Sequence, residues 1–169
     1  GEHDRLMGVI RDAWGRMINT GATSFWEMFR PPEFEYPTRS HCHGWSSAPT
    51  YFLSRCQMGV RPTAPGFAEA EIAPVPLDLD WCAGSMPTPH GTIDVRWERR
   101  EDEFILRLDC PPEVRPTALL PVEPTEFTAI TCNGEQPERV GMVRSYQARE
   151  GEYSIELDRG AAVTLRAVR

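Results

Sequence analysis

The run Thr92-Ile-Asp-Val-Arg-Trp-Glu-Arg-Arg-Glu-Asp-Glu-Phe-Ile-Leu-Arg-Leu108 decides the fold class of the larger part of this chain. An apolar side chain falls on every second residue over 93–97 and again over 104–108. Alternation with a period of two is typical of a strand that buries one face and exposes the other to solvent. The acidic pair Glu101-Asp102 separates the two runs, so the sequence predicts a β-hairpin.

Six further segments are predicted to be strands because each is short, apolar and bounded by turn residues. Asn133-Gly134 and Arg159-Gly160 supply two of the turns. Eight short strands over about a hundred residues, with no helix between them, predict an antiparallel β-sandwich. The six segments are 67–72, 81–85, 118–121, 127–132, 153–157 and 162–168.

The first third of the chain has a helical pattern instead. Apolar residues recur at helical spacing over 3–20, and Gly21 is a natural end for that helix. A second helix is predicted over 46–58, where either serine at 46–47 can cap the first turn. Gly59 follows and can end it.

The turn-rich segment 61–66 marks the boundary between the two patterns. We therefore predict an α+β chain with a helical segment at 1–62 and a β-sandwich domain at 63–169. Two amphipathic helices form only half of a layer, and they must bury their apolar faces on something. Either they cover the sandwich, or they are the last hairpin of a helical domain that continues outside this chain.

The aromatic content of the helices favours the second of these options. A hairpin of this kind should expose Trp14, Phe25, Trp26 or Phe52 and self-associate through its exposed helical faces. A stand-alone protein should instead be monomeric, with both helices packed on the sheets.

Bulk composition excludes several classes of function. The 169 residues carry a net charge of −7, which argues against nucleic-acid binding because phosphate recognition needs clustered positive charge. No apolar run of about 18 residues is present, so no membrane segment is expected. The five cysteines form no C-x-x-C pair, a pattern that favours a reducing compartment, and we expect a cytoplasmic location. We expect no cofactor.

Two short segments carry residues that suit sugar chemistry. They are Thr23-Ser-Phe-Trp-Glu-Met-Phe29 and Ser40-His-Cys-His-Gly-Trp-Ser-Ser-Ala-Pro49. Aromatic faces stack on the apolar face of a pyranose, while carboxylate and imidazole groups bind hydroxyls or move protons. Glu27, beside Trp26, is the candidate catalytic carboxylate, because glycoside hydrolysis generally uses two carboxyl groups around the scissile bond.

Each of these residues also has a structural interpretation. Glu27 can be an acid paired with a nearby arginine such as Arg30. His41 and His43 can bind sugar hydroxyls or cap the following helix, and their H-x-H spacing is only weak evidence for a metal site, so we expect no metal. Trp45 can be a core residue instead of part of a binding surface.

The polar residues of the predicted strands are expected to be solvated surface. Trp81 and Trp97 are assigned to the sandwich, and the alternative for either is an exposed platform that binds carbohydrate.

Four stretches give the chain a resemblance to a known family. They are Gly21-Ala-Thr-Ser-Phe-Trp-Glu27, the stretch 40–49 quoted above, Met58-Gly-Val-Arg-Pro-Thr-Ala-Pro-Gly-Phe67, and Trp81-Cys-Ala-Gly-Ser-Met-Pro-Thr-Pro-His-Gly-Thr-Ile-Asp-Val-Arg-Trp97. In this order and spacing they resemble the C-terminal part of bacterial α-L-rhamnosidases, glycoside hydrolase family 78. The resemblance covers about residues 13–98, and the rest matches only as a sandwich.

The resemblance implies an (α/α)6 barrel whose final helices are present here, followed by the family's C-terminal β-sandwich. It also implies an inverting hydrolase that releases terminal L-rhamnose from plant glycosides or polysaccharides. Glu27 falls on the family's general base, His43 on a histidine near the rhamnose ring, and Trp26 on the aromatic wall of the pocket. His41 is the poorer match for that histidine, and Trp45 is a further candidate substrate-binding residue.

The family's general acid lies early in the barrel, and this chain has no matching segment. We therefore expect a C-terminal fragment of an inverting α-L-rhamnosidase that hydrolyses no rhamnoside by itself. Its expected partners are rhamnose-containing glycosides or polysaccharides and the missing N-terminal part of the enzyme. The alternative function is a non-catalytic module, either carbohydrate-binding or interdomain support, in which the sandwich is the working part.

Overall fold

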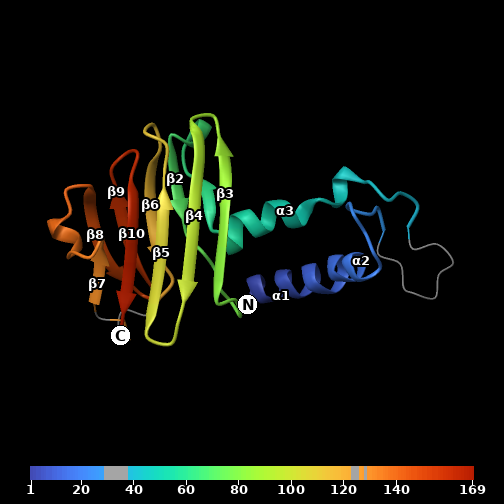
Figure 1. Cartoon of the computed structure of the whole chain (residues 1–169), viewed down its shortest axis with the longest axis horizontal. Helices are drawn as coiled ribbons and strands as arrows, with labels where there is room; N and C mark the ends of the chain where they lie inside the picture. The colour runs from blue at the N-terminus through green and yellow to red at the C-terminus, as the bar shows by residue number, and fades with distance from the viewer. Residues whose placement is uncertain (29–37, 123–125, 128) are drawn as a thin grey trace. The chain divides into compact units, whose positions relative to one another are not determined.

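The computed structural model of the chain forms two compact units, Gly1–Leu53 and Ser54–Arg169, and each is described by itself (Figure 1). The described residues are 1–28, 38–122, 126–127 and 129–169. Within them, no helix is both long enough and apolar enough to cross a bilayer. The division after Leu53 lies nine residues before the boundary placed after position 62 from the sequence. The assignment of the helical segment to the end of an (α/α)6 barrel stays a prediction.

The first helix runs without a break from residue 2 to residue 19, which confirms the helix predicted over 3–20. Gly21 follows with a φ of 90°, a left-handed conformation that glycine adopts without steric cost, and so ends the helix. One face of the helix buries Met7, Ile10, Ala13 and Met17. The helix consists of α1 (Glu2–Val9), the π-helical turn η1 (Ile10–Trp14) and α2 (Gly15–Asn19).

The second predicted helix is a series of short helical segments. Pro49 lies in the first turn of α3, where its missing N–H leaves no helical hydrogen bond unmade. Ser47 occupies the N-cap, but its hydroxyl donates to the Gly44 carbonyl at 2.6 Å, so the expected side-chain cap is not formed. The segments are the 3₁₀ turn η2 (Gly44–Ser46), α3 (Ala48–Phe52) and the π-helical turn η3 (Leu53–Gln57).

The second unit is a β-sandwich, and its described residues form ten strands in two sheets of five (Figure 1). One sheet has the order β1-β2-β6-β9-β8 and the other the order β3-β4-β5-β10-β7. The strands are β1 (Val60–Pro62), β2 (Glu69–Ile72), β3 (Trp81–Thr88), β4 (Gly91–Arg99), β5 (Glu103–Asp109), β6 (Arg115–Leu120), β7 (Ala129–Cys132), β8 (Val143–Arg149), β9 (Glu152–Leu157) and β10 (Ala162–Val168).

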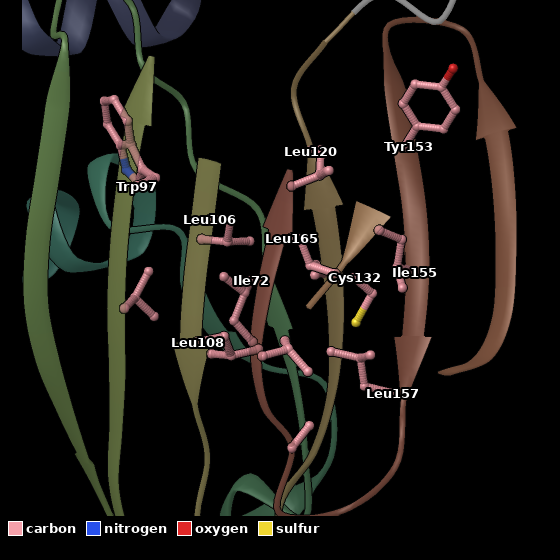
Figure 2. Close-up of a cluster of buried hydrophobic side chains, with 14 of the residues drawn as sticks. Ile72, Trp97, Leu106, Leu108, Leu120, Cys132, Tyr153, Ile155, Leu157 and Leu165 are labelled. Atoms are coloured by element: carbon pink, nitrogen blue, oxygen red, sulfur yellow. The ribbon is translucent and has the colours of Figure 1, made fainter. Parts of the chain in front are cut away.

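The inner faces of both sheets share one apolar core. Figure 2 shows Leu106 and Leu108 of β5 in the same cluster as Ile155 and Leu157 of β9. Trp97 of β4 is fully buried. Its indole N–H donates to the Gln57 carbonyl at 2.7 Å, and its ring stacks on Phe104 with 5.9 Å between ring centroids. Because most of these side chains are fully buried, the sandwich has a complete core of its own.

The eight predicted strands are all found, with small shifts at their ends. The quoted hairpin is confirmed by antiparallel pairing of β4 with β5, in which Trp97 lies opposite Leu106. Asn133 and Gly134 have φ values of 54° and 85°, as a tight turn between strands requires.

Three details differ from the prediction. The predicted connector 61–66 is partly strand, because Arg61 and Pro62 belong to β1, which pairs with β2. Strand β8 was not predicted. Its side chains are exposed or half-buried because it lies at the edge of its sheet. The sandwich is also not wholly antiparallel, since β2 and β6 pair in parallel.

Candidate active-site segment

The two sugar-site segments of the first unit are joined by backbone hydrogen bonds. The Glu27 N–H donates to the Ser40 carbonyl at 3.0 Å, and the His43 N–H donates to the Phe25 carbonyl at 2.8 Å. The Ser24 hydroxyl donates to the His41 carbonyl. Two extended segments that lie twelve or more residues apart in sequence therefore run side by side in opposite directions.

One aromatic pair lies across these segments. The rings of Trp26 and His41 meet edge to face, with 5.2 Å between centroids. Trp26 is only 7% exposed, so the expectation that a helical hairpin would expose this side chain is wrong. The Trp26 side chain is therefore already covered, whereas His41, the other member of the pair, is exposed.

A second aromatic pair follows. His43 and Trp45 also meet edge to face, with 6.0 Å between centroids. Trp45 is 93% exposed, which excludes a core role for it within the described residues. The Trp14 indole N–H donates to the Ser46 carbonyl at 2.8 Å and so ties the first helix to the turn that carries Trp45. Trp14 itself is half-buried, and so are Phe25 and Phe52.

The Glu27 side chain is half-buried. Among the residues that the structure describes, its carboxylate has no hydrogen bond and no ion pair, whereas its backbone N–H is fixed on Ser40. The alternative partner, Arg30, lies outside the described residues. Glu27 is therefore a carboxylate of fixed backbone position, available to bind a water molecule or a sugar hydroxyl.

Metal ligands do not gather in the described part of the chain. No group of three or more histidine, cysteine, aspartate or glutamate side chains lies close enough there to hold an ion. His41 and His43 instead each contact an indole ring. The five cysteines are all unpaired thiols.

Comparison with known proteins gives these segments a context. Residues 59–134 match the family described as "Bacterial alpha-L-rhamnosidase C-terminal domain". An alpha-L-rhamnosidase of Alteromonas sp. (strain LOR) is 25% identical over 164 residues, which are 92% of this chain and 17% of that protein. One of Formosa agariphila is 24% identical over 128 residues, 72% of this chain and 14% of that protein.

Solved structures agree in fold. The alpha-L-rhamnosidase of Dictyoglumus thermophilum superposes with a TM-score of 0.74 at 21% identity, over 92% of this chain and 17% of that one. The family 78 rhamnosidase of Bacillus sp. GL1 is 38% identical, with a TM-score of 0.60 over 66% of this chain and 12% of that one. In sequence and fold this chain resembles the C-terminal portion of bacterial α-L-rhamnosidases.

The resemblance to family 78 stated from the motifs is thereby confirmed, and so is the β-sandwich. The chain spans less than a fifth of the relatives it matches, 17% and 14% of their lengths. The structure of Streptomyces avermitilis α-L-rhamnosidase complexed with L-rhamnose superposes with a TM-score of 0.74 at 21% identity, over 92% of this chain and 15% of that one. The roles of individual residues in catalysis stay predictions.

The sequence did not single out the outer face of strands β3 to β5 in the sandwich. From the sequence, the polar residues of this face are expected to be solvated surface, and an exposed tryptophan that binds carbohydrate is only the alternative for Trp81 or Trp97. The structure resolves that alternative, because Trp97 is fully buried while Trp81 is 58% exposed. The alternation in the sequence could have indicated this outer face, because the residues between the buried positions of β4 are the charged residues Asp94, Arg96 and Glu98.

Proposed function

We propose that this chain carries the water-activating half of an inverting α-L-rhamnosidase active site, with Glu27 as general base. The supporting observation is the half-buried Glu27 carboxylate, whose backbone N–H is hydrogen-bonded to Ser40, the residue before exposed His41. Its relatives are α-L-rhamnosidases, and a structural neighbour was solved with L-rhamnose. Rhamnose-containing glycosides are therefore the proposed substrates.

The proposed reaction is a single displacement. Glu27 accepts a proton from a water molecule, and the water oxygen attacks the anomeric carbon as the glycosidic C–O bond breaks. The leaving oxygen takes a proton from a carboxylic acid that polypeptide outside this chain supplies. His43 and Trp45 contact the sugar, with the imidazole on hydroxyls and the indole on the apolar face. Trp26 and His41 hold the shape of the pocket next to the base.

The isolated chain should release no p-nitrophenol from p-nitrophenyl α-L-rhamnopyranoside, because it lacks the acid. In a longer polypeptide that supplies the acid, Glu27→Gln should lower kcat by about 10²- to 10⁴-fold with little change in KM. Glu2→Gln, an exposed acid on α1, is the matched control and should leave both constants unchanged.

Two results contradict this proposal. Turnover by the isolated chain would show that the acid is present within it. A Glu27→Gln variant with a raised KM and an unchanged kcat would give Glu27 a role in binding or folding instead.

The cytoplasmic location expected from the cysteine pattern stays a prediction, which fractionation of the producing cell can test.

A further inference from the structure

The outer face of the β3-β4-β5 sheet has an ordered pattern of polar side chains. Strand register places residues of neighbouring strands opposite one another in rows across this face. One row is acidic where β4 meets β5, the next row is basic, and the third begins with an exposed tryptophan. We call these residues the outer-face rows. They are Ser85–Asp94–Asp109, Ala83–Arg96–Arg107 and Trp81–Glu98.

The first two rows line an open depression of about 450 Å³. Its β3 side is formed by the small residues Ala83, Gly84 and Ser85, and the longer side chains of β4 and β5 form the rest. A shallow recess between short and long side chains suits a flat ligand that binds along the sheet.

The charge pattern of the depression is not one that stability alone would favour. Asp94 lies directly opposite Asp109, and Arg96 directly opposite Arg107. Like charges that face each other across neighbouring strands destabilise a sheet. The Ser85 hydroxyl donates to Asp94, whereas Asp109 has no hydrogen bond and no ion pair among the described residues.

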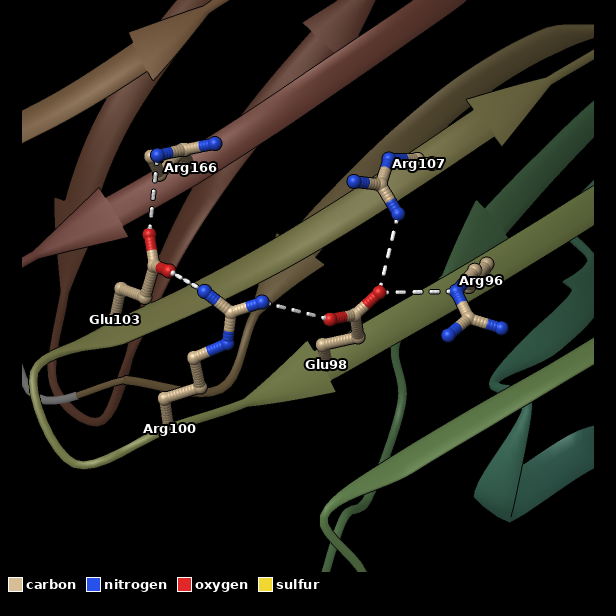
Figure 3. Close-up of polar contacts among 6 residues, drawn as sticks. All are labelled: Arg96, Glu98, Arg100, Glu103, Arg107 and Arg166. Atoms are coloured by element: carbon tan, nitrogen blue, oxygen red, sulfur yellow. Dashed lines mark hydrogen bonds and ion pairs between the residues drawn. The ribbon is translucent and has the colours of Figure 1, made fainter.

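The two arginines are held in place by one carboxylate, as Figure 3 shows. Arg96 Nε lies 3.0 Å and Arg107 Nη1 3.1 Å from the same oxygen of Glu98. The hydrogen bond from Arg96 lowers the pKa of Glu98, and contacts with Arg107 and Arg100 add to the effect. Both guanidinium groups keep N–H donors that Glu98 does not use, because each has five and the geometry engages one.

An aromatic ring borders the basic row. The guanidinium carbon of Arg96 lies 5.3 Å from the centre of the Trp81 ring. This contact restrains the indole, which remains 58% exposed. A fixed, exposed indole beside hydrogen-bonding groups provides a stacking surface for the apolar face of a pyranose.

We propose that the outer-face rows bind a neutral oligosaccharide. The depression offers two carboxylates and two guanidinium groups, so their formal charges cancel and no ionic ligand is favoured. Sugar hydroxyls both donate and accept, and here carboxylates accept while guanidinium groups donate. Trp81 stacks on a neighbouring sugar ring. Because every residue of this surface lies in the sandwich unit, the inference does not depend on the role proposed for Glu27.

The test is titration of the full chain followed by nitrogen-edited NMR. The neutral probes are methyl α-L-rhamnopyranoside, cellohexaose and xylohexaose, and the anionic probe is trigalacturonate. At least one neutral probe should bind and shift amide signals of β3 to β5. Trp81→Ala should weaken that binding roughly 2- to 10-fold, the range for loss of one aromatic contact. Asp109→Asn should weaken it about 10-fold or more, since a charge-assisted hydrogen bond is lost.

Matched variants separate this surface from the rest of the chain. Tyr51→Ala removes another aromatic residue that is 58% exposed, and Asp102→Asn removes an exposed acid from the β4–β5 turn. Both should bind as the wild-type chain does. The side chains of Trp81, Asp109, Tyr51 and Asp102 are all exposed, so unchanged circular dichroism should confirm that these four variants fold.

Three outcomes overturn the proposal. One is that none of the neutral probes binds. Another is that trigalacturonate binds more tightly than the neutral probes, which would make the ligand an anion. The third is that a neutral probe binds but its affinity drops in Glu27→Gln or His43→Ala and not in Trp81→Ala, which would place the sugar in the helical unit. That last result would leave the proposed role of Glu27 standing.

Discussion

Three glycines of the sandwich unit form a graded series for testing how tightly its loops are packed. Gly59, Gly134 and Gly160 have φ values of 85°, 85° and 68°, so each holds a left-handed backbone. A Cβ added at Gly134 would meet nothing within 4 Å, and one added at Gly160 would lie 2.9 Å from the Pro112 Cα. At Gly59 the Cβ would overlap the backbone at 73–74. Replacement by alanine therefore imposes the same backbone strain at all three positions. The steric overlap of the added Cβ with neighbouring atoms increases from Gly134 to Gly160 to Gly59.

The loss of stability can be estimated from these contacts. Left-handed backbone costs alanine about 1–2 kcal/mol, and the reduced freedom of the unfolded chain offsets about 0.4–1 kcal/mol of that. Gly134→Ala should therefore lower the free energy of unfolding by about 1 kcal/mol. Gly160→Ala must also displace a backbone atom, which brings the total to about 2 kcal/mol. Gly59→Ala displaces three backbone atoms and strains the hydrogen bond from the Ala73 N–H to the Gly59 carbonyl, for about 3–4 kcal/mol.

Urea denaturation followed by tryptophan fluorescence measures this series, because buried Trp97 reports on the sandwich core. At about 4 °C per kcal/mol, Gly59→Ala should also lower the melting temperature by about 12 °C or more. The refuting result is a Gly59→Ala variant no less stable than Gly134→Ala. That outcome would mean that the 73–74 backbone moves freely and that the junction before β1 is not tightly packed.

The remaining predictions concern single side chains. Gln57 is 2% exposed and neither polar atom of its side chain has a partner among the described residues, so Gln57→Met should raise the free energy of unfolding by about 1–3 kcal/mol in the same titration. Burial raises the pKa of the Cys110 thiol to about 12, whereas Cys42 is exposed; native-state alkylation followed by mass spectrometry should therefore label Cys42 first and leave Cys110 unlabelled until the protein unfolds. The pKa of Glu98 is lowered by its arginine contacts from an ordinary value of 4.5, so its stabilisation is fully present above that pH and is lost as pH falls through the lowered pKa. The stability difference between wild type and Glu98→Gln should accordingly stay constant from about pH 7 down to about pH 4.5 and shrink as the pH falls further. Ile18 is 71% exposed on the first helix, and Ile18→Ser should reduce any self-association seen by analytical ultracentrifugation.

Local patterns were sufficient to predict the strands that bury one face. Buried and exposed residues alternate in β4 because one side of that strand lies in the core, and β5 follows the same pattern except at Ile105, which is buried as well. The structure confirms both strands. Strand β8 lacks that pattern since it is an edge strand with few buried side chains. Strand β1 contains Pro62, which favours a loop prediction, and an edge strand tolerates it.

Pairing between distant segments could not be predicted in the same way. The parallel pair β2–β6 joins residues more than forty positions apart, such as Glu69 and Arg115, and no local signal encodes which strands become neighbours. The same limit applies to the helical unit. The sequence identified Glu27 and His43 as candidates, but the backbone bonds that set their segments side by side connect stretches with a proline-rich interval between them.

Exposure was the property predicted least well, and the reason is physical. Trp26 and Trp45 are both tryptophans near the same histidines, yet they are 7% and 93% exposed. Which of the two is covered depends on the turn at Gly44–Ser46 and on the bond from Trp14 to Ser46, neither of which has a sequence signature. A residue type can suggest sugar chemistry, but only the fold decides which ring remains available for it.

The two units differ in how complete they are as structures, and this difference bears on both proposals. Within the described residues, large exposed apolar side chains are concentrated in the helical unit, where five occur: Val9, Ile18, Trp45, Tyr51 and Leu53. The sandwich has one, Trp81, and a core in which most side chains are fully buried. Two helices cannot cover their own apolar faces, so an active site built on them needs further polypeptide to enclose the sugar. The sandwich needs no such cover, and its outer face can therefore be tested for sugar binding on this chain alone.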